Sequence, residues 1–165
     1  MMTTQPEMMT FKTTEVKKNY FTMMQVRHSL NMILSEMSGL DWKPHIVLGI
    51  NRGGCVPGIY LSHALDIPHE TLDIRLRDHK SKPSLAVLEK AHAFQKKILI
   101  IDDINDTGDT FNYIVENFGK GDGRIKFAAL MHNKPSKAKV DYQGYEIDKS
   151  KDPALIVFPW EEWDK

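Results

Sequence analysis

The sequence has little cysteine, no excess of charge of either sign and no long hydrophobic run. Cys55 is the single cysteine among 165 residues, which excludes an internal disulfide and fits a reducing environment. Lysine and arginine number 22, as do aspartate and glutamate, so charge gives no reason to expect nucleic acid or a membrane surface as the partner. No apolar run approaches the roughly 18 residues that a membrane span needs. We therefore expect a cytoplasmic protein without a membrane span.

The length allows one domain with a hydrophobic core. The N-terminus lacks the apolar region of a signal peptide, so residues 1–18 are predicted to form a flexible leader. A single domain is predicted over residues 19–165. The seven histidines are scattered without the spacing of metal ligands.

Hydrophobic patterning predicts strands that alternate with helices. Strands are predicted over residues 45–50, 70–76, 98–101 and 125–131. Helices are predicted over residues 22–39, where Thr22 and Gln25 form a capping box, and over residues 56–65 and 110–118. This alternation is typical of βαβ units, so we expect an α/β fold with a central, mostly parallel sheet flanked by helices.

The most informative segment is KKILIIDDINDTGDTF, residues 96–111. Asp102 and Asp103 follow a predicted buried strand, and ligands of open α/β sheets bind beyond the carboxyl ends of strands. The next loop begins a predicted helix, where free backbone N–H groups and the helix dipole favour a phosphate. Together these features indicate a phosphorylated sugar whose diol and metal ion are held by the acids. The alternative is ordinary strand-end and turn chemistry.

A second loop, Asn51-Arg52-Gly53-Gly54, follows the predicted strand 45–50. Two glycines let the backbone approach an anion closely, and the arginine brings a delocalised positive charge. A tight turn with a solvent-facing arginine explains this loop equally well on its own. Neither loop carries the lysine of a Walker A element or the pattern GxGxxG of a dinucleotide fold.

Residues 98–110 resemble the PRPP-binding signature of type I phosphoribosyltransferases. That signature is a hydrophobic strand, two acids, two variable residues, an acid and Thr-Gly-x-Thr, and every position matches. The resemblance extends from about residue 20 to residue 160. It implies Mg²⁺-dependent transfer of ribose 5-phosphate from PRPP to a base, with release of pyrophosphate.

The resemblance also implies roles for individual residues. Asp102 and Asp103 would hold the ribose hydroxyls and Mg²⁺, and Asp106 would act near the purine N7 as the general acid or base. The 5-phosphate would bind to Thr107, Gly108, Asp109 and Thr110. Pyrophosphate would bind to Arg52, Gly53 and Gly54, with a non-proline cis peptide bond before Arg52. The polar loop 75–84 would close over the pyrophosphate.

The C-terminal part resembles the base-binding hood of purine phosphoribosyltransferases, most closely the xanthine-guanine group, and we predict this hood at about residues 133–165. The resemblance implies that Lys134 donates to the exocyclic oxygen of the base and that Leu155 and Ile156 contact the base. Leu155 replaces the stacking tryptophan of that group, and Val157 replaces an acidic residue. A 6-oxopurine (guanine, xanthine or hypoxanthine), purine salvage and a homodimer or homotetramer follow as expectations.

Two alternatives stay open. The first is a PRPP-binding or nucleotide-binding regulatory protein on the same fold, with altered or lost catalysis, because a fold does not fix a function. The second is an acidic phosphate-binding domain of the response-regulator type. That class carries its acid pair after the first strand, whereas here two βα units precede Asp102, so the sequence disfavours it.

Overall fold

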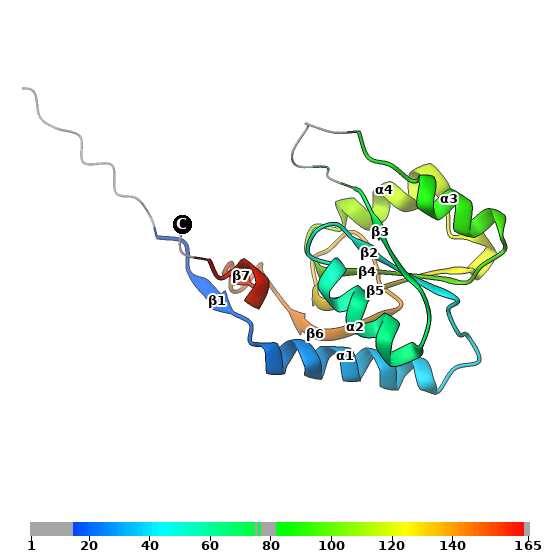
Figure 1. Cartoon of the computed structure of the whole chain (residues 1–165). Coiled ribbons are helices and arrows are strands. Elements are labelled where there is room, and N and C mark those ends of the chain that lie inside the picture. The colour runs from blue at the N-terminus through cyan, green and yellow to red at the C-terminus, as the bar shows by residue number, and fades with distance from the viewer. Residues whose placement is uncertain (1–14, 75, 77–81, 164–165) are drawn as a thin grey trace, which may run out of the picture.

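The structure is a computed structural model that describes residues 15–74, 76 and 82–163. Its main sheet has five parallel strands in the order β3-β2-β4-β5-β6 (Figure 1). The strands are β2 (Ile46–Ile50), β3 (His69–Leu72), β4 (Ile98–Asn105), β5 (Ile125–Asn133) and β6 (Tyr142–Ile147). The predicted α/β fold with a central parallel sheet is confirmed.

Helices cover both faces of this sheet. The residues of α1 (Met23–Ser38) and α2 (Cys55–Leu65) pack with Leu99 and Ile101 of β4 in one core cluster. The other cluster joins Ile98 and Ile100 to α3 (Ala86–Ala93) and α4 (Asp109–Phe118). All four β4 residues are fully buried, because a central parallel strand is covered on both faces. This explains the unbroken aliphatic run that precedes the acid pair.

Local sequence signals locate some helices better than others. The capping box of Thr22 and Gln25 is present at the start of α1, as predicted. Helix α3 was not predicted; it is short and has no side-chain hydrogen bond at its N-cap. Only Leu88 and Ala91 of α3 are buried, so its apolar pattern is weak.

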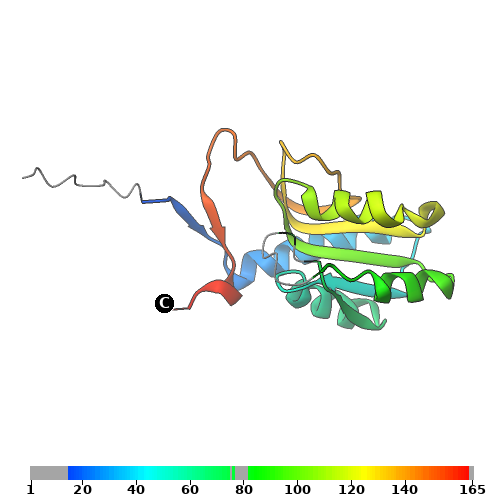
Figure 2. The same cartoon turned by 90° about the horizontal axis from the view of Figure 1, so that it is seen from above.

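A second, two-stranded sheet lies beyond one end of the main sheet (Figure 2). It pairs β1 (Lys18–Tyr20) in parallel with β7 (Leu155–Val157), and a 3₁₀ turn (Pro159–Glu161) follows. We call β1, β7 and this turn the hood. Aromatic contacts connect it to the main domain, because Phe21 packs edge-on against both Tyr145 and Phe158.

The structure differs from two predicted boundaries, the end of the leader and the start of the hood. The predicted leader reaches too far, because Lys17 forms an ion pair with Asp152 at 2.8 Å and Lys18 begins β1. Residues 1–14 lie outside the described part of the chain. The predicted hood began near residue 133, but β6 belongs to the main sheet, where it pairs with β5. Among the described residues, no helix has the length and apolar character needed to cross a membrane.

Candidate functional site

A cavity of about 480 Å³ lies at the carboxyl ends of β2 and β4, between the main sheet and the hood. It brings together predicted site residues from widely separated parts of the chain. Those that line it are Arg52, Asp102, Asp103, Asp106, Thr107, Gly108, Asp109, Thr110, Leu155 and Ile156. Of the predicted closing loop, residues 75 and 77–81 lie outside the described residues, and Leu76 lines the cavity.

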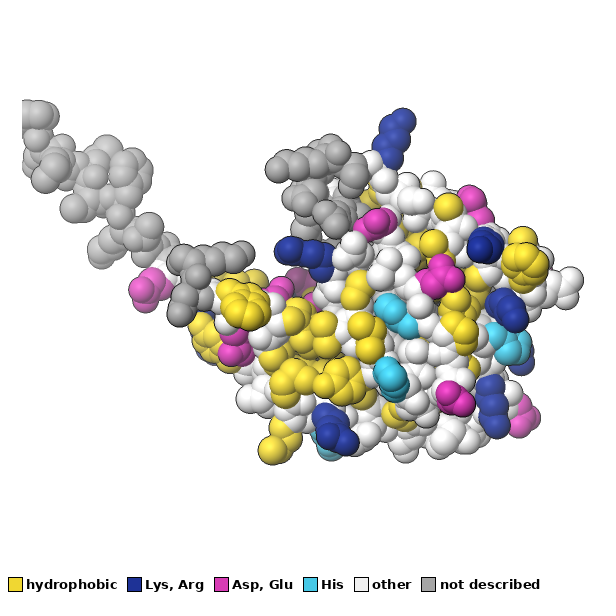
Figure 3. All heavy atoms as spheres, in the orientation of Figure 1, with side chains coloured by type: hydrophobic (Ala, Val, Ile, Leu, Met, Phe, Trp, Pro, Cys, Tyr) yellow, Lys and Arg dark blue, Asp and Glu magenta, His cyan; other side chains and the backbone are white. Residues whose placement is uncertain are grey.

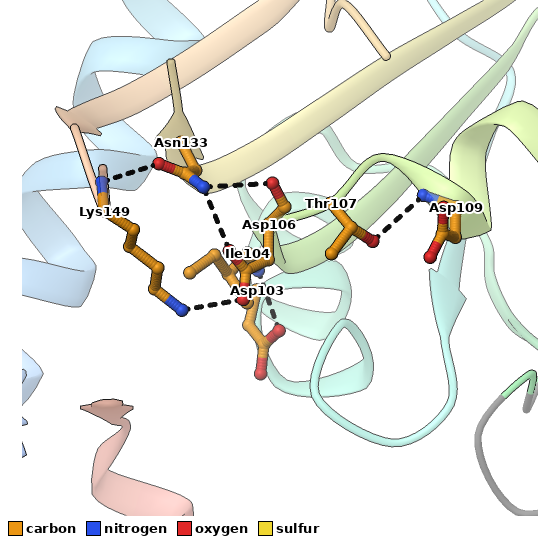
Figure 4. A network of polar contacts seen from close by, with 7 residues as sticks. All are labelled: Asp103, Ile104, Asp106, Thr107, Asp109, Asn133 and Lys149. Carbon is orange, nitrogen blue, oxygen red and sulfur yellow. Dashed lines mark hydrogen bonds and ion pairs between the residues drawn. The ribbon is translucent and has the colours of Figure 1, made fainter. Parts of the chain in front are cut away.

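The acid pair occupies the last part of β4, which is longer than predicted and extends to Asn105. The backbone N–H of Asp103 donates to Asp102 Oδ1 at 2.9 Å, and the N–H of Ile104 donates to Asp103 Oδ1 at 2.7 Å. Figure 4 shows the Asp103 carboxylate in this position. Both side chains are only partly exposed, and strand backbone fixes their positions.

Burial raises the pKa of the Asp103 carboxyl to about 6, and the negative charge of Glu161 acts in the same direction. The hydrogen bond from Ile104 N–H and the neighbouring Asp102 lower this pKa without cancelling the rise. The folded protein therefore bears an energetic cost when Asp103 is ionised, and a cation beside this carboxylate would offset that cost.

This raised pKa predicts a pH-dependent stability in chelator-treated, ligand-free buffer. The folded state binds the Asp103 proton more tightly than the unfolded chain, so its stabilising contribution is present at low pH and is lost as the pH rises through about 6. A rise from 3.8 to about 6 corresponds to at most about 3 kcal/mol. We expect Asp103→Asn to be more stable than wild type at pH ~7.5, by roughly 1–3 kcal/mol, with a smaller gain at pH ~4.5.

Urea unfolding at the two pH values measures this difference. The exposed Asp66, which caps the C-terminus of α2 in a left-handed conformation that asparagine also accepts, provides the control variant Asp66→Asn. A gain for Asp103→Asn that is equal at both pH values would contradict the burial argument.

The Arg52 loop packs directly on the acid pair. A Cβ atom on Gly53 would lie 1.9 Å from Asp103 Oδ2, and one on Gly54 would lie 2.2 Å from the carbonyl oxygen of Ile101. Both positions therefore require glycine for close approach, although Asn51 and Arg52 are the members of this loop that line the cavity. The peptide bond between Asn51 and Arg52 is cis, as predicted.

The loop of residues 106–110 leads into the N-terminus of α4. Gly108 has a φ of 89°, and a Cβ atom there would lie 2.4 Å from Ala138 N. Residues 136–138 support this loop, since Lys137 N–H donates to the Thr107 carbonyl at 3.0 Å. The buried Asn105 strengthens the support by donating to the Ala138 carbonyl at 2.7 Å. The loop thus presents the start of α4 to the cavity in a fixed conformation.

Asp106 belongs to a network with two residues that the sequence analysis did not identify (Figure 4). Lys149 Nζ lies 2.7 Å from Asp106 Oδ2, and Asn133 Nδ2 donates to Asp106 Oδ1 at 3.1 Å. Asn133 Oδ1 in turn accepts the backbone N–H of Lys149 at 2.9 Å. Asn133 ends β5 and Lys149 follows β6, so the signal that could have found them is their place after strands of the sheet.

Glu161 also lines the cavity and was not predicted. Its Oε2 accepts the backbone N–H of Phe158 at 2.9 Å, which closes the 3₁₀ turn of the hood. Its sequence position, beside Trp160 near the end of the chain, carried no recognisable signal.

The structure does not bring Lys134 together with the other predicted site residues, and its proposed contact with the base stays a prediction. Its side chain is 57% exposed and pairs with Glu146 at 3.1 Å, and it is absent from the described residues that line the cavity. The reason is local: Lys134 follows Asn133, whose side chain turns inward to Asp106 while Lys134 N–H donates to the Ile147 carbonyl.

The acid pair fits a metal ion that arrives with a phosphorylated ligand. Among the described residues, no group of three or more histidine, cysteine, aspartate or glutamate side chains could hold a metal. Mg²⁺ is commonly held by one or two carboxylates together with phosphate oxygens and water, and Asp102 and Asp103 supply two carboxylates at the cavity. The site is therefore suited to a phosphorylated ligand that carries a metal ion, with the apolar side chains of Leu155, Ile156 and Phe158 on the hood side.

Comparison with known proteins agrees with this geometry. A family model described as a phosphoribosyl transferase domain matches residues 12–163. The purine phosphoribosyltransferase of Pyrococcus horikoshii is 30% identical, with 90% of this chain and 97% of that chain covered and a TM-score of 0.64.

Two more distant structures share the fold. The xanthine-guanine-hypoxanthine phosphoribosyltransferase of Helicobacter pylori is 16% identical, with 90% of this chain and 95% of that chain covered and a TM-score of 0.67. A hypothetical protein of Neisseria gonorrhoeae with bound ppGpp is 18% identical, with 90% and 92% covered and a TM-score of 0.68.

Proposed function

The chain belongs to the phosphoribosyl transferase domain family, and from this premise we propose that it transfers ribose 5-phosphate from PRPP to a 6-oxopurine. Members of this family bind PRPP and a base and release pyrophosphate. The observation that carries the proposal is the single cavity shared by the acid pair, the 106–110 loop, Arg52 and the hood.

Each part of the proposed reaction has residues suited to it. The 5-phosphate binds at the start of α4, and Asp102 and Asp103 hold the ribose hydroxyls. Arg52 and the backbone beside it stabilise the pyrophosphate as the bond from the anomeric carbon to its oxygen breaks. Mg²⁺, held by the acid pair and the pyrophosphate, would supply further neutralisation of the leaving group.

Asp106 is the proposed general base. As N9 of the purine bonds to the anomeric carbon, the proton on N7 passes to the Asp106 carboxylate, so the neutral base becomes a neutral N9-substituted product. Asn133 holds this carboxylate through Oδ1, at 3.1 Å, and Lys149 holds it through Oδ2. The hydrogen bonds fix its orientation toward the cavity.

The hood supplies the surface for the base. Leu155 and Ile156 line the cavity together with the buried Phe158. The 30% identical relative is named a purine phosphoribosyltransferase, which supports a purine at this surface. We propose purine salvage as the context for this reaction.

We also propose that the protein assembles as a homodimer or homotetramer. Hydrophobic side chains gather on one face of the molecule (Figure 3). Exposed large hydrophobic residues of β1, α1 and α2 include Tyr20, Met23, Met24, Ile59 and Tyr60. A gathering of this kind on a surface favours self-association.

A panel of bases tests the function. Pyrophosphate release is followed with PRPP, Mg²⁺ and guanine, xanthine, hypoxanthine, adenine, orotate or uracil in turn. Turnover with a 6-oxopurine and little with the others is the expected result. Tight PRPP binding without turnover of any base would favour the regulatory alternative, and preference for adenine or a pyrimidine would refute the 6-oxopurine.

Replacement of Leu155 should strengthen base binding. Leu155 is 47% exposed and lines the cavity, but leucine lacks the quadrupole of an aromatic ring. We expect Leu155→Trp to lower KM for the preferred purine about 2- to 12-fold. This change corresponds to roughly 0.5–1.5 kcal/mol of binding free energy, the contribution of an aromatic pair. Steady-state kinetics measure this change, and Val16→Trp, at an exposed position outside the cavity lining, is the control. An unchanged or higher KM would mean that the base does not stack on residue 155.

A further inference from the structure

The Arg52 loop, residues 51–54, is held from both sides by residues of the neighbouring strand ends. Strand β2 lies between β3 and β4 in the main sheet, so the loop that follows β2 has one neighbour on each side. On the β4 side, Gly53 packs so closely on Asp103 that a Cβ atom would meet its carboxylate. On the β3 side, Asn51 Nδ2 donates to Asp73 Oδ1 at 2.7 Å. Asp73 therefore contacts the loop from the side opposite the acid pair.

The strand pairing brings Asn51 and Asp73 together. Ile50 and Leu72 are partners in the parallel pairing of β2 with β3, and Asn51 and Asp73 are the residues that directly follow them. The backbone N–H of Asn51 donates to the Leu72 carbonyl at 3.0 Å, and the Asp73 carbonyl accepts the N–H of Ser84 at 2.9 Å. These hydrogen bonds hold the backbone of both residues, so the contact between their side chains follows from the fold.

The contact fixes the orientation of the Asn51 side chain. An ionised carboxylate only accepts hydrogen bonds, whereas an amide donates through nitrogen and accepts through oxygen. Asp73 thus decides which end of the Asn51 amide faces it, and a hydrogen bond to a charged partner is stronger than one between neutral groups. Asn51 and Arg52 both line the cavity. Because they are adjacent in the chain, a fixed Asn51 also restricts the position of the Arg52 backbone.

We propose that Asp73 is a positioning residue for pyrophosphate, which acts through Asn51 by holding the Arg52 loop in its binding conformation. This inference rests on the proposed function, in which that loop stabilises the leaving group. Asp73 is absent from the described residues that line the cavity, so its effect on a ligand passes through Asn51. The alternative is an ordinary contact at a strand end, which contributes little because Asp73 is exposed.

The two phosphorylated ends of PRPP distinguish these alternatives. In the proposed function, the 5-phosphate binds at the start of α4 and the ribose hydroxyls bind to the acid pair, whereas only the pyrophosphate reaches the Arg52 loop. Ribose 5-phosphate keeps the first two contacts and lacks the third. Loss of the contact between Asp73 and Asn51 should therefore weaken the binding of PRPP and leave the binding of ribose 5-phosphate unchanged.

The test uses variants of the full chain. Asp73→Ala removes the acceptor, and Asp73→Asn keeps an acceptor oxygen at the same position. Asn51→Ala and the double variant Asn51→Ala/Asp73→Ala show whether the two residues act through one contact. Glu70→Ala is the matched control, because Glu70 is an exposed acid of β3 and is absent from the described residues that line the cavity. Calorimetry measures the affinities for PRPP with Mg²⁺ and for ribose 5-phosphate.

We expect Asp73→Ala to lower PRPP affinity about 3- to 30-fold, the contribution of a charge-assisted hydrogen bond reduced by exposure. Ribose 5-phosphate affinity should equal that of wild type. Asp73→Asn should keep most of the PRPP affinity, and the double variant should bind PRPP no more weakly than Asn51→Ala does. Glu70→Ala should bind both ligands as the wild type does. Equal weakening of both ligands by Asp73→Ala, or additive effects in the double variant, would overturn the assignment.

Two further outcomes separate this inference from the proposed function. If the wild type binds PRPP more tightly than ribose 5-phosphate and Asp73→Ala preserves that ratio, the role of Asp73 is wrong while the proposed function stands. If the wild-type protein does not bind PRPP, the proposed function fails and the role of Asp73 fails with it.

Discussion

Asp106→Asn is expected to lower kcat with the preferred base by about 10²–10⁴, the usual contribution of a general acid or base. PRPP affinity should change by less than about tenfold, since the proposed partner of Asp106 is the base and not the sugar. An asparagine at this position can still accept a hydrogen bond from Lys149 Nζ, which lies 2.7 Å from Asp106 Oδ2, but it cannot take a proton from N7. Steady-state kinetics and calorimetry with PRPP measure the two effects separately.

Asp122→Asn is the matched control for this variant. Asp122 is exposed in the turn before β5 and has a φ of 55°, a left-handed conformation that asparagine accepts. Its kcat should equal that of wild type. An Asp106→Asn protein with undiminished kcat would reduce Asp106 to a loop residue that holds Lys149 and Asn133.

The double variant Asp102→Asn/Asp103→Asn is expected to lose most PRPP affinity. A hydrogen bond to a charged group contributes about 1.5–3 kcal/mol, so removing both charges should weaken binding about 10²–10⁴-fold. The residual binding should no longer depend on Mg²⁺, because the two carboxylates are the proposed metal ligands. Calorimetric titrations with and without Mg²⁺ measure both properties.

The result has a built-in control for folding. Asp103→Asn is expected to stabilise the ligand-free protein at neutral pH, so weak binding by the double variant would not reflect an unfolded chain. Asp66→Asn, at a position outside the cavity lining, should bind PRPP as the wild type does. Mg²⁺-dependent binding of undiminished strength in the double variant would end the assignment of the acid pair.

The sequence predicted the centre of the site because its signals are local. Four aliphatic residues, the acid pair and a glycine-containing helix start follow one another within β4 and α4, so strand burial and helix capping act on neighbouring residues. The Arg52 loop was predictable for the same reason. Gly53 and Gly54 directly follow β2, and close packing against Asp103 and Ile101 requires both of them.

The sequence was a poorer guide where residues meet only through the fold. Lys134 and Lys149 both occur in polar, turn-forming surroundings, and nothing local distinguishes the exposed one from the one at the cavity. The buried amide of Asn133 places Lys149 at the cavity, because it hydrogen-bonds both Asp106 and the backbone N–H of Lys149. Strand β1 was likewise missed, because three exposed residues show no apolar pattern and depend on a partner at the other end of the chain.

The pairing of β1 with β7 has a consequence for biosynthesis. Lys18 lies beside Leu155, so the hood joins the earliest and the latest secondary-structure strands of the described chain. During synthesis, the five strands of the main sheet, including the acid pair of β4, emerge from the ribosome before β7 does. A nascent chain can thus form the main sheet with the acid pair and the 106–110 loop before β1 can pair with β7. The surface proposed for the base is completed only after β7 has been translated.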